Sequence, residues 1–150
     1  MSDASKPKLV GINHVAIEVG DIDEALAWYG RLFDFTLRGK GERNAFIDMG
    51  DQFVNLTLVA ERREGVERRH IGFVVDDRSS VKARAEAAGA VIVEGPFLDF
   101  LDPWGNRLEI IEYSNIQFSK APEVLRGMGL TLGKNESAKK ELADKGMAPE

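Results

Sequence analysis

The chain of 150 residues carries a formal net charge of −5 and has two histidines and no cysteine. This length suits one domain or two small packed modules, and the missing cysteines exclude disulfides, thiolate catalysis and zinc sites built on cysteine. The negative charge argues against nucleic acid as a partner, because phosphate backbones normally meet a basic face. No apolar run is long enough to cross a bilayer, and the first residues lack the apolar segment of a secretory signal, so we expect a cytoplasmic protein without a membrane partner.

The first half of the chain opens with a strand whose two sides differ. Apolar side chains at alternate positions predict one buried side, and His14 falls on the opposite side, among small or polar residues. Asp21 is a candidate N-cap for the helix that follows, with Glu24 at the third helical position. The predicted elements of this half are a strand at 11–20, a helix at 22–33 and strands at 35–42, 44–49 and 53–59.

The second half repeats this order. His70 opens a second alternating strand 56 positions after His14, and Asp77 is a second N-cap candidate. A type I turn is expected at 102–105, which has Asp, Pro and Gly at the favoured positions, and its Trp104 should pack on the C-terminal tail or on a second subunit. The predicted elements are a strand at 69–76, a helix with Val81, Ala85 and Ala88 on one face that stops at Gly89, and strands at 91–93, 97–101 and 107–113.

A repeat with a period of 54–56 residues describes the whole fold. Each half reads strand–helix–strand–strand–strand, so we predict an α+β fold of two βαβββ modules with mixed sheets. The domain organisation expected is one paired domain at 1–113, with modules at 9–60 and 69–113 joined by a charged linker, and a helical C-terminal extension at 114–150. The extension should hold short helices at 122–129 and 135–145, and the thin apolar stripe of the second should dock on a partner surface or fray.

The repeat also brings four polar positions into correspondence. Each half opens with a histidine, and Asn55 and Glu109 occupy equivalent positions in the last strand of each half. Two histidines at the same point of a repeated strand indicate a shared site. Strand parity assigns Glu109 to the side of that site, because its neighbours Leu108 and Ile110 must face the helix.

Three segments carry a resemblance to a known superfamily: Asn-His-Val-Ala-Ile-Glu-Val at 13–19, His-Ile-Gly-Phe-Val-Val at 70–75 and Asp-Pro-Trp-Gly-Asn-Arg-Leu-Glu-Ile-Ile-Glu at 102–112. With the repeat, they resemble the vicinal oxygen chelate superfamily of glyoxalases, bleomycin-resistance proteins and extradiol dioxygenases. The resemblance implies two half-barrel sheets that cup one divalent transition metal (Fe, Mn, Ni, Co or Zn), and a homodimer. It implies His14, His70 and Glu109 as metal ligands, with Asn55 at a fourth ligand position.

Two imidazoles and a carboxylate leave open positions on such a metal, where adjacent oxygens of a small substrate can bind. Asn55 departs from the family members that use four protein ligands, and its neutral amide is a poor metal ligand. The chain also has no third histidine of the kind that extradiol enzymes use. We therefore expect a metal-dependent enzyme with a small oxygenated substrate, lyase or isomerase chemistry and Glu109 as both ligand and base. Two alternatives stay open: an Fe(II) extradiol-type ring-cleaving dioxygenase, and a metal-free ligand-sequestering protein of the bleomycin-resistance kind.

A mostly apolar wall with a few polar groups is expected beside the metal, as in most sites for small molecules. The substrate-binding residues assigned to this wall are Asn55, Phe53, Phe97, Phe100 and Asp48. Trp28 and Tyr29 are assigned instead to the core or to an interface.

Overall fold

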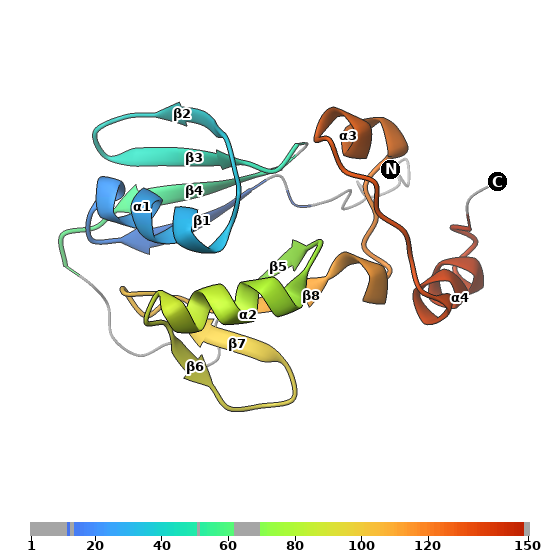
Figure 1. Ribbon diagram of the computed structural model, residues 1–150. Coiled ribbons are helices and arrows are strands. Elements are labelled where there is room, and N and C mark those ends of the chain that lie inside the picture. The colour runs from blue at the N-terminus through green and yellow to red at the C-terminus, as the bar shows by residue number, and fades with distance from the viewer. Residues whose placement is uncertain (1–11, 13, 51, 62–69, 149–150) are drawn as a thin grey trace, which may run out of the picture.

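The computed structural model describes residues 12, 14–50, 52–61 and 70–148 (Figure 1). The first module holds β1 (His14–Val19), α1 (Ile22–Leu32), β2 (Leu37–Lys40), β3 (Asn44–Asp48) and β4 (Phe53–Leu58). The second holds β5 (His70–Val75), α2 (Arg78–Ala87), β6 (Val91–Val93), β7 (Leu98–Leu101) and β8 (Arg107–Glu112), and the extension holds η1 (Tyr113–Asn115), α3 (Pro122–Gly127) and α4 (Glu136–Asp144). The βαβββ order of both halves confirms the predicted α+β fold. The predicted charged linker lies outside the described residues except for Glu61.

Each module forms one four-stranded mixed sheet in which the first strand pairs with the last. The strand orders are β1-β4-β3-β2 and β5-β8-β7-β6, and only the β1–β4 and β5–β8 pairs are parallel. His14 lies opposite Phe53, and His70 lies opposite Arg107. The first and last strands therefore pair in the same register in both modules, so equivalent positions of the repeat occupy equivalent places on the two sheets.

Both long helices begin at the aspartates predicted as N-caps. Asp21 Oδ1 accepts a hydrogen bond from the Glu24 N–H at 2.8 Å, and Asp77 Oδ1 accepts one from the Ser80 N–H at 3.0 Å. These contacts satisfy N–H groups that the first turn of a helix leaves without partners. The hydrogen bonds from the Ser79 hydroxyl and from the Ser80 N–H lower the pKa of Asp77.

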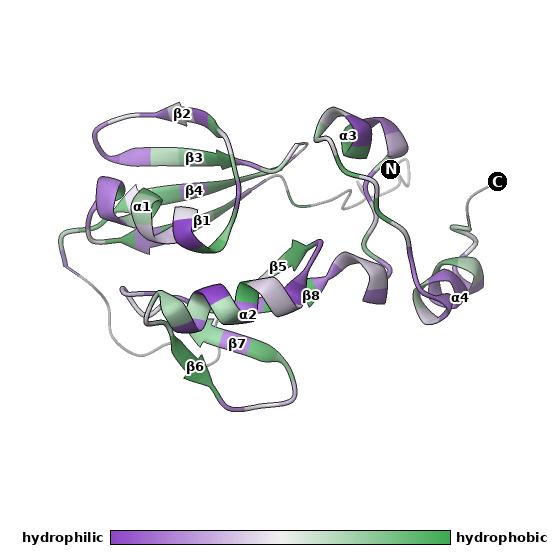
Figure 2. Ribbon diagram, in the orientation of Figure 1, coloured by the Kyte–Doolittle hydropathy of each residue, from purple (hydrophilic) through white to green (hydrophobic). Residues whose placement is uncertain are grey.

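One hydrophobic core joins the two modules, because the helix-bearing sides of both sheets face each other. Its buried members come from β1, α1, β3 and β4 of the first module and from α2, β7 and β8 of the second. Between ring centroids, Trp28 lies 6.3 Å from Phe100, and Phe33 lies 5.9 Å from Phe73. Figure 2 shows the hydrophobic colour on β5 and β6 and mixed colours along α2. Because the helix-bearing sides of the sheets form the core, the opposite side of each sheet points outward.

A buried polar cluster also links the modules at the β7–β8 turn. Asp102 is 4% exposed, and its Oδ2 accepts a hydrogen bond from the Tyr29 hydroxyl on α1 at 2.8 Å. The Asn106 amide donates to Asp102 Oδ2 at 2.6 Å and to the Glu18 carbonyl at 2.9 Å. Burial, and then the charge of Asp102 and its hydrogen bond, raise the pKa of Tyr29 well above its usual value.

Trp104, in the same turn, packs on the loop between β1 and α1. A Cβ built on Gly20 would lie 2.8 Å from Trp104 Nε1, so the missing side chain of that glycine makes room for the indole. Trp104 therefore packs at the junction of the two modules, and its packing on a second subunit stays a prediction.

The C-terminal extension lies at one end of the two modules (Figure 1). At the β3–β4 turn, a Cβ built on Gly50 would come within 2.8 Å of Met128 Sδ and 3.1 Å of Val124 Cγ1, so α3 and its C-terminal end lie against the first module. Helix α4 buries Ala138 and Leu142 and contacts η1, which continues the last strand of the second module. The apolar stripe of α4 therefore docks on its own chain.

Lys134 holds the extension to the end of the second module. Its Nζ lies 3.3 Å from the centroid of the Tyr113 ring and donates hydrogen bonds to the carbonyls of Tyr113, at 2.7 Å, and of Phe118. Partial burial lowers the pKa of the Lys134 ammonium. In the described part of the chain, no helix is both long enough and apolar enough to cross a bilayer.

Candidate functional site

The side of each sheet that is turned away from its helix, which we call the open face, carries the candidate site residues. On the first module, β1 presents His14 there while Ile17 and Val19 lie in the core. The His14 imidazole stacks on the Phe53 ring of β4, with centroids 4.7 Å apart and planes 10° apart. The Phe46 ring of β3 meets Phe53 edge-on at 5.6 Å. These contacts form an aromatic cluster around one of the predicted metal ligands.

Asn55 lies on the same face, one step along β4 from this cluster. Its Cα partners are Ala16 on β1 and Phe46 on β3. Its Oδ1 is buried and has no hydrogen-bond partner among the described residues. A buried acceptor without a partner costs free energy, so this oxygen is a candidate for contact with a ligand.

The open face of the second module brings two predicted ligands together. His70 Nε2 lies 3.7 Å from Glu109 Oε2, and the two side chains are 46% and 20% exposed. Glu109 is the Cα partner of Gly72, two residues after His70, just as Asn55 is the partner of Ala16, two residues after His14. The two positions of each pair therefore have the same diagonal relation on the two sheets.

Asp99 shares the open face with Glu109, and the sequence analysis did not assign it to the site. It is the Cα partner of Glu109 across the β7–β8 pair, and it is 4% exposed. Arg107 Nε donates a hydrogen bond to Asp99 Oδ2 at 2.8 Å, while Asp99 Oδ1 is buried and has no hydrogen-bond partner among the described residues. Strand parity could have indicated the place of Asp99, because a residue of β7 that pairs with Glu109 must lie on the same face of the sheet.

The residues assigned to the substrate wall divide between the two sheets. Phe53, Asn55 and Asp48 belong to the first module, where Asp48 Oδ1 accepts a hydrogen bond from the Gly50 N–H at 2.9 Å. Phe97 directly precedes β7 and is 60% exposed. The placement of Phe100 on this wall is wrong, because Phe100 pairs with Leu108, is fully buried and packs near Trp28 in the core.

The three predicted metal ligands do not meet within one chain. His14 belongs to the first sheet and the His70–Glu109 pair to the second, and the two open faces point outward on either side of the shared core. Across the residues that the structure describes, no group of three or more histidine, aspartate or glutamate side chains is arranged to hold one ion.

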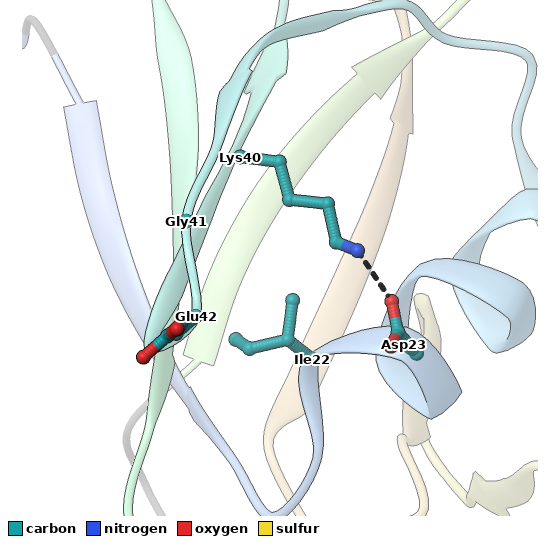
Figure 3. A pocket seen from close by; sticks show the side chains of 5 residues that line it. All are labelled: Ile22, Asp23, Lys40, Gly41 and Glu42. Carbon is teal, nitrogen blue, oxygen red and sulfur yellow. Dashed lines mark ion pairs between the residues drawn. The ribbon is translucent and has the colours of Figure 1, made fainter.

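Two surface hollows lie away from these residues. An open hollow of about 450 Å³ is bounded by the start of α1 and the end of β2, where Lys40 Nζ reaches Asp23 Oδ1 at 2.6 Å (Figure 3). Its lining residues are Ile22, Asp23, Lys40, Gly41 and Glu42. A second hollow of about 220 Å³ lies beside Trp104. Neither hollow contains a predicted ligand, so the open faces remain the candidate site.

Two named proteins are similar in sequence. The chain is 28% identical over 113 residues to the glutathione transferase FosA of Serratia marcescens, an alignment that covers 68% of this chain and 80% of that protein. It is 28% identical over 123 residues to a protein of Vibrio cholerae named probable lactoylglutathione lyase, with 67% of this chain and 89% of that protein covered.

Solved structures share the fold. The integron cassette protein VCH_CASS1 of V. cholerae matches with a TM-score of 0.56 at 23% identity, covering 73% of this chain and 99% of that one. The lactoylglutathione lyase of Agrobacterium tumefaciens matches with a TM-score of 0.54 at 24% identity, covering 72% and 96%. Residues 11–110 match the family model described as Glyoxalase/Bleomycin resistance protein/Dioxygenase superfamily. Because that match covers more than half of the chain, the chain belongs to the glyoxalase/bleomycin resistance protein/dioxygenase superfamily.

Proposed function

We propose that this protein is a metal-dependent enzyme that acts on a small oxygenated substrate by lyase or isomerase chemistry, in a site assembled between two copies of the chain. The observation that carries the proposal is the His70–Glu109 pair, 3.7 Å apart on an open sheet face, with His14 at the equivalent place on the other module. Its two relatives at 28% identity carry the names of a transferase and a lyase, which supports enzymatic activity.

The residues fit a divalent transition metal. Nitrogen and oxygen donors bound about 2.1 Å from one ion lie at most about 4 Å apart, and the separation of His70 Nε2 and Glu109 Oε2 is within this limit. Two imidazoles and one carboxylate are a donor set that suits Fe, Mn, Co, Ni or Zn. The unpartnered Oδ1 of Asn55, on the face that carries His14, adds a weak donor or a hydrogen-bond acceptor for the substrate.

The metal would polarise a carbonyl of the substrate and so make a proton on the neighbouring carbon easier to remove. Glu109 would accept that proton at its carboxylate and return it at the adjacent carbon. Arg107 neutralises the charge of Asp99, so Glu109 does not face a second bare carboxylate across the strand pair. Phe53 and Phe46 would exclude water from the apolar part of the substrate.

A homodimer would complete the ligand set. Because the two open faces of one chain point apart, a chain cannot close its own His14 over its own His70 and Glu109 without breaking the shared core. Two copies related by a twofold axis would place the open face of the first module against the open face of the partner's second module. Each of the two equivalent sites would then use His70 and Glu109 of one chain and His14 of the partner subunit.

The test is metal stoichiometry in single and mixed variants. The wild type should bind one divalent ion per chain by elemental analysis, and His14→Ala and His70→Ala should each abolish tight binding. Co-refolding these two variants in equal amounts should restore about a quarter of the wild-type sites, since half of the dimers are mixed and each mixed dimer has one intact site of two.

Glu109→Ala mixed with His70→Ala is the matched control. Both changes fall on the same side of the shared site, so no mixed dimer regains a complete ligand set and binding should stay absent. Restoration in neither mixture would refute assembly between chains, and full metal retention in all single variants would refute the ligand assignment. Activity of the loaded protein on thiohemiacetals but not on catechols would separate lyase or isomerase chemistry from ring cleavage.

A further inference from the structure

The cations on the described sheets have partners of different kinds. Lys40 forms an ion pair with Asp23 on the helix side of the first sheet, and Arg107 is paired with Asp99 on the open face of the second. Arg38, on β2, forms no ion pair with any described residue. Its guanidinium lies instead over the Phe53 ring, with Cζ 4.8 Å from the ring centroid. A guanidinium that pairs with no carboxylate among the described residues, and that lies over the same ring on which His14 stacks, is a candidate for binding a ligand.

An irregularity in β2 turns Arg38 toward the open face. Leu37 pairs with Ile47, and Gly39 pairs with Phe46, so Arg38 is an extra residue between two successive pairs. Ile47 belongs to the core and Phe46 to the open face. Without the extra residue, Arg38 would take the place opposite Ile47 and point at the helix. Bulges of this kind commonly redirect a side chain beside a functional site.

The Phe53 ring joins Arg38 to His14. The centre of the imidazole and the guanidinium carbon both lie within 5 Å of its centroid. The guanidinium carbon is thus no more than 9.5 Å from the centre of the imidazole. The contact with the ring keeps the guanidinium on the open face, and a guanidinium over an aromatic ring can still donate hydrogen bonds through its N–H groups.

We propose that Arg38 determines substrate specificity by binding an anionic group of the substrate, a carboxylate or a phosphonate, while other oxygens of the same molecule reach the metal. A guanidinium fork donates two parallel hydrogen bonds to such a group, and these are among the strongest that a protein makes. This inference rests on the proposed function. It adds the requirement that the substrate carries a negative charge a few bonds away from its chelating oxygens.

The experiment uses methylphosphonate and acetate, which present one anionic group and no second chelating oxygen arm. The full-length, ¹⁵N-labelled protein is titrated with each, and the Arg38 Nε–H and the amides of Gly39 and Phe53 are followed by NMR. Saturable shifts are expected with at least one probe. Arg38→Gln should weaken binding about tenfold to a hundredfold, the range for a charge-assisted hydrogen bond, and Arg38→Lys should retain part of the affinity.

Lys40→Gln is the matched control, because it removes the same charge from the same strand on the other side of the sheet. It should bind both probes within about twofold of the wild type, a change smaller than that of a single weak hydrogen bond. Equal binding by Arg38→Gln and Lys40→Gln, or no saturable shift with either probe, would overturn the inference. Metal stoichiometry separates the two proposals. If the chain binds metal but Arg38→Gln binds the probes as tightly as the wild type, only the role of Arg38 is refuted. If the chain binds no metal but Arg38→Gln still binds the probes more weakly, only the proposed function is refuted.

Discussion

The side-chain oxygen of Asn55 is buried on the open face of the first module without a hydrogen-bond partner among the described residues. Its counterpart in the repeat, Glu109, approaches His70. A neutral amide competes poorly with water and carboxylates for a divalent metal. Asn55 is therefore better suited to orient a substrate than to hold the ion.

Asn55→Ala should leave metal affinity nearly unchanged and weaken substrate binding by about 1 kcal/mol, the value of one hydrogen bond. Asn55→Glu should bind metal more tightly, because a carboxylate at this position adds a charged donor. Competition titration against a chromogenic chelator measures the metal affinity of both variants. Loss of metal in Asn55→Ala as complete as in His70→Ala would make Asn55 a true fourth ligand.

Tyr29 allows a second test at the level of one hydroxyl. Its hydrogen bond to Asp102 crosses the module boundary in a buried setting. Tyr29→Phe should lower the free energy of unfolding by about 1–2 kcal/mol at neutral pH, because Asp102 loses one donor. Urea unfolding of both proteins at pH 7 provides the measurement.

The same variant should respond differently to alkali. The pKa of Tyr29 is raised in the folded state, whereas an unfolded tyrosine ionises near pH 10. Unfolding therefore releases a proton above about pH 10, so the stabilisation by Tyr29 is complete below that pH and is lost as the pH rises further. The stability gap between wild type and Tyr29→Phe should close between about pH 10 and 11. A gap that stays constant over this interval would contradict the role of this hydroxyl.

At the scale of the elements, the contact between α3 and the β3–β4 turn depends on Gly50. This glycine has φ +89°, and a Cβ on it would meet Met128 and Val124. Gly89 has a similar φ of +74°, but a Cβ built there would meet nothing within 4 Å. Substitutions at these two glycines therefore separate the free-energy cost of the left-handed backbone from the cost of displacing Met128 and Val124.

Gly89→Ala should cost about 1–2 kcal/mol for the left-handed backbone, and Gly50→Ala should cost about 1 kcal/mol more for the displaced side chains. Urea unfolding measures both. Hydrogen exchange should show faster opening of α3 in Gly50→Ala alone. Adding Met128→Ala to Gly50→Ala should recover part of the difference. Equal costs at the two glycines would show that α3 does not press on this turn.

Local pattern predicted the elements well, because each carries its own signal. The N-cap aspartates and the alternation of apolar residues fixed where α1, β4 and β8 lie to within a few residues. The placement of both Phe97 and Phe100 on one wall failed for a reason visible in the sequence, since residues three apart in a strand face opposite sides. Arg38 escaped notice because a bulge changes the parity of a strand, and the residue identities alone do not reveal it.

At the scale of the whole molecule, the packing of the modules decides which site residues meet. The repeat correctly matched His14 with His70 and Asn55 with Glu109, but it contains no information on whether the sheets pack through their helices or through their open faces. The core contacts of Trp28 and Phe33 with the second module settle this. Such long-range contacts depend on shape and volume, which a one-dimensional pattern does not record.

The pairing of the first strand of each module with the last has a consequence for the order of folding. Among the strands that the structure describes, β1 has β4 as its only neighbour, and His14 and its partner Phe53 are 39 positions apart in the chain. Helices form from local contacts, whereas a loop of this length must close before β1 gains a hydrogen bond, so completion of the sheet is the slow event. During synthesis the first module leaves the ribosome before α2 and β7, which pack against α1, have emerged. Its apolar helix side therefore stays exposed to other chains until the second module has been translated.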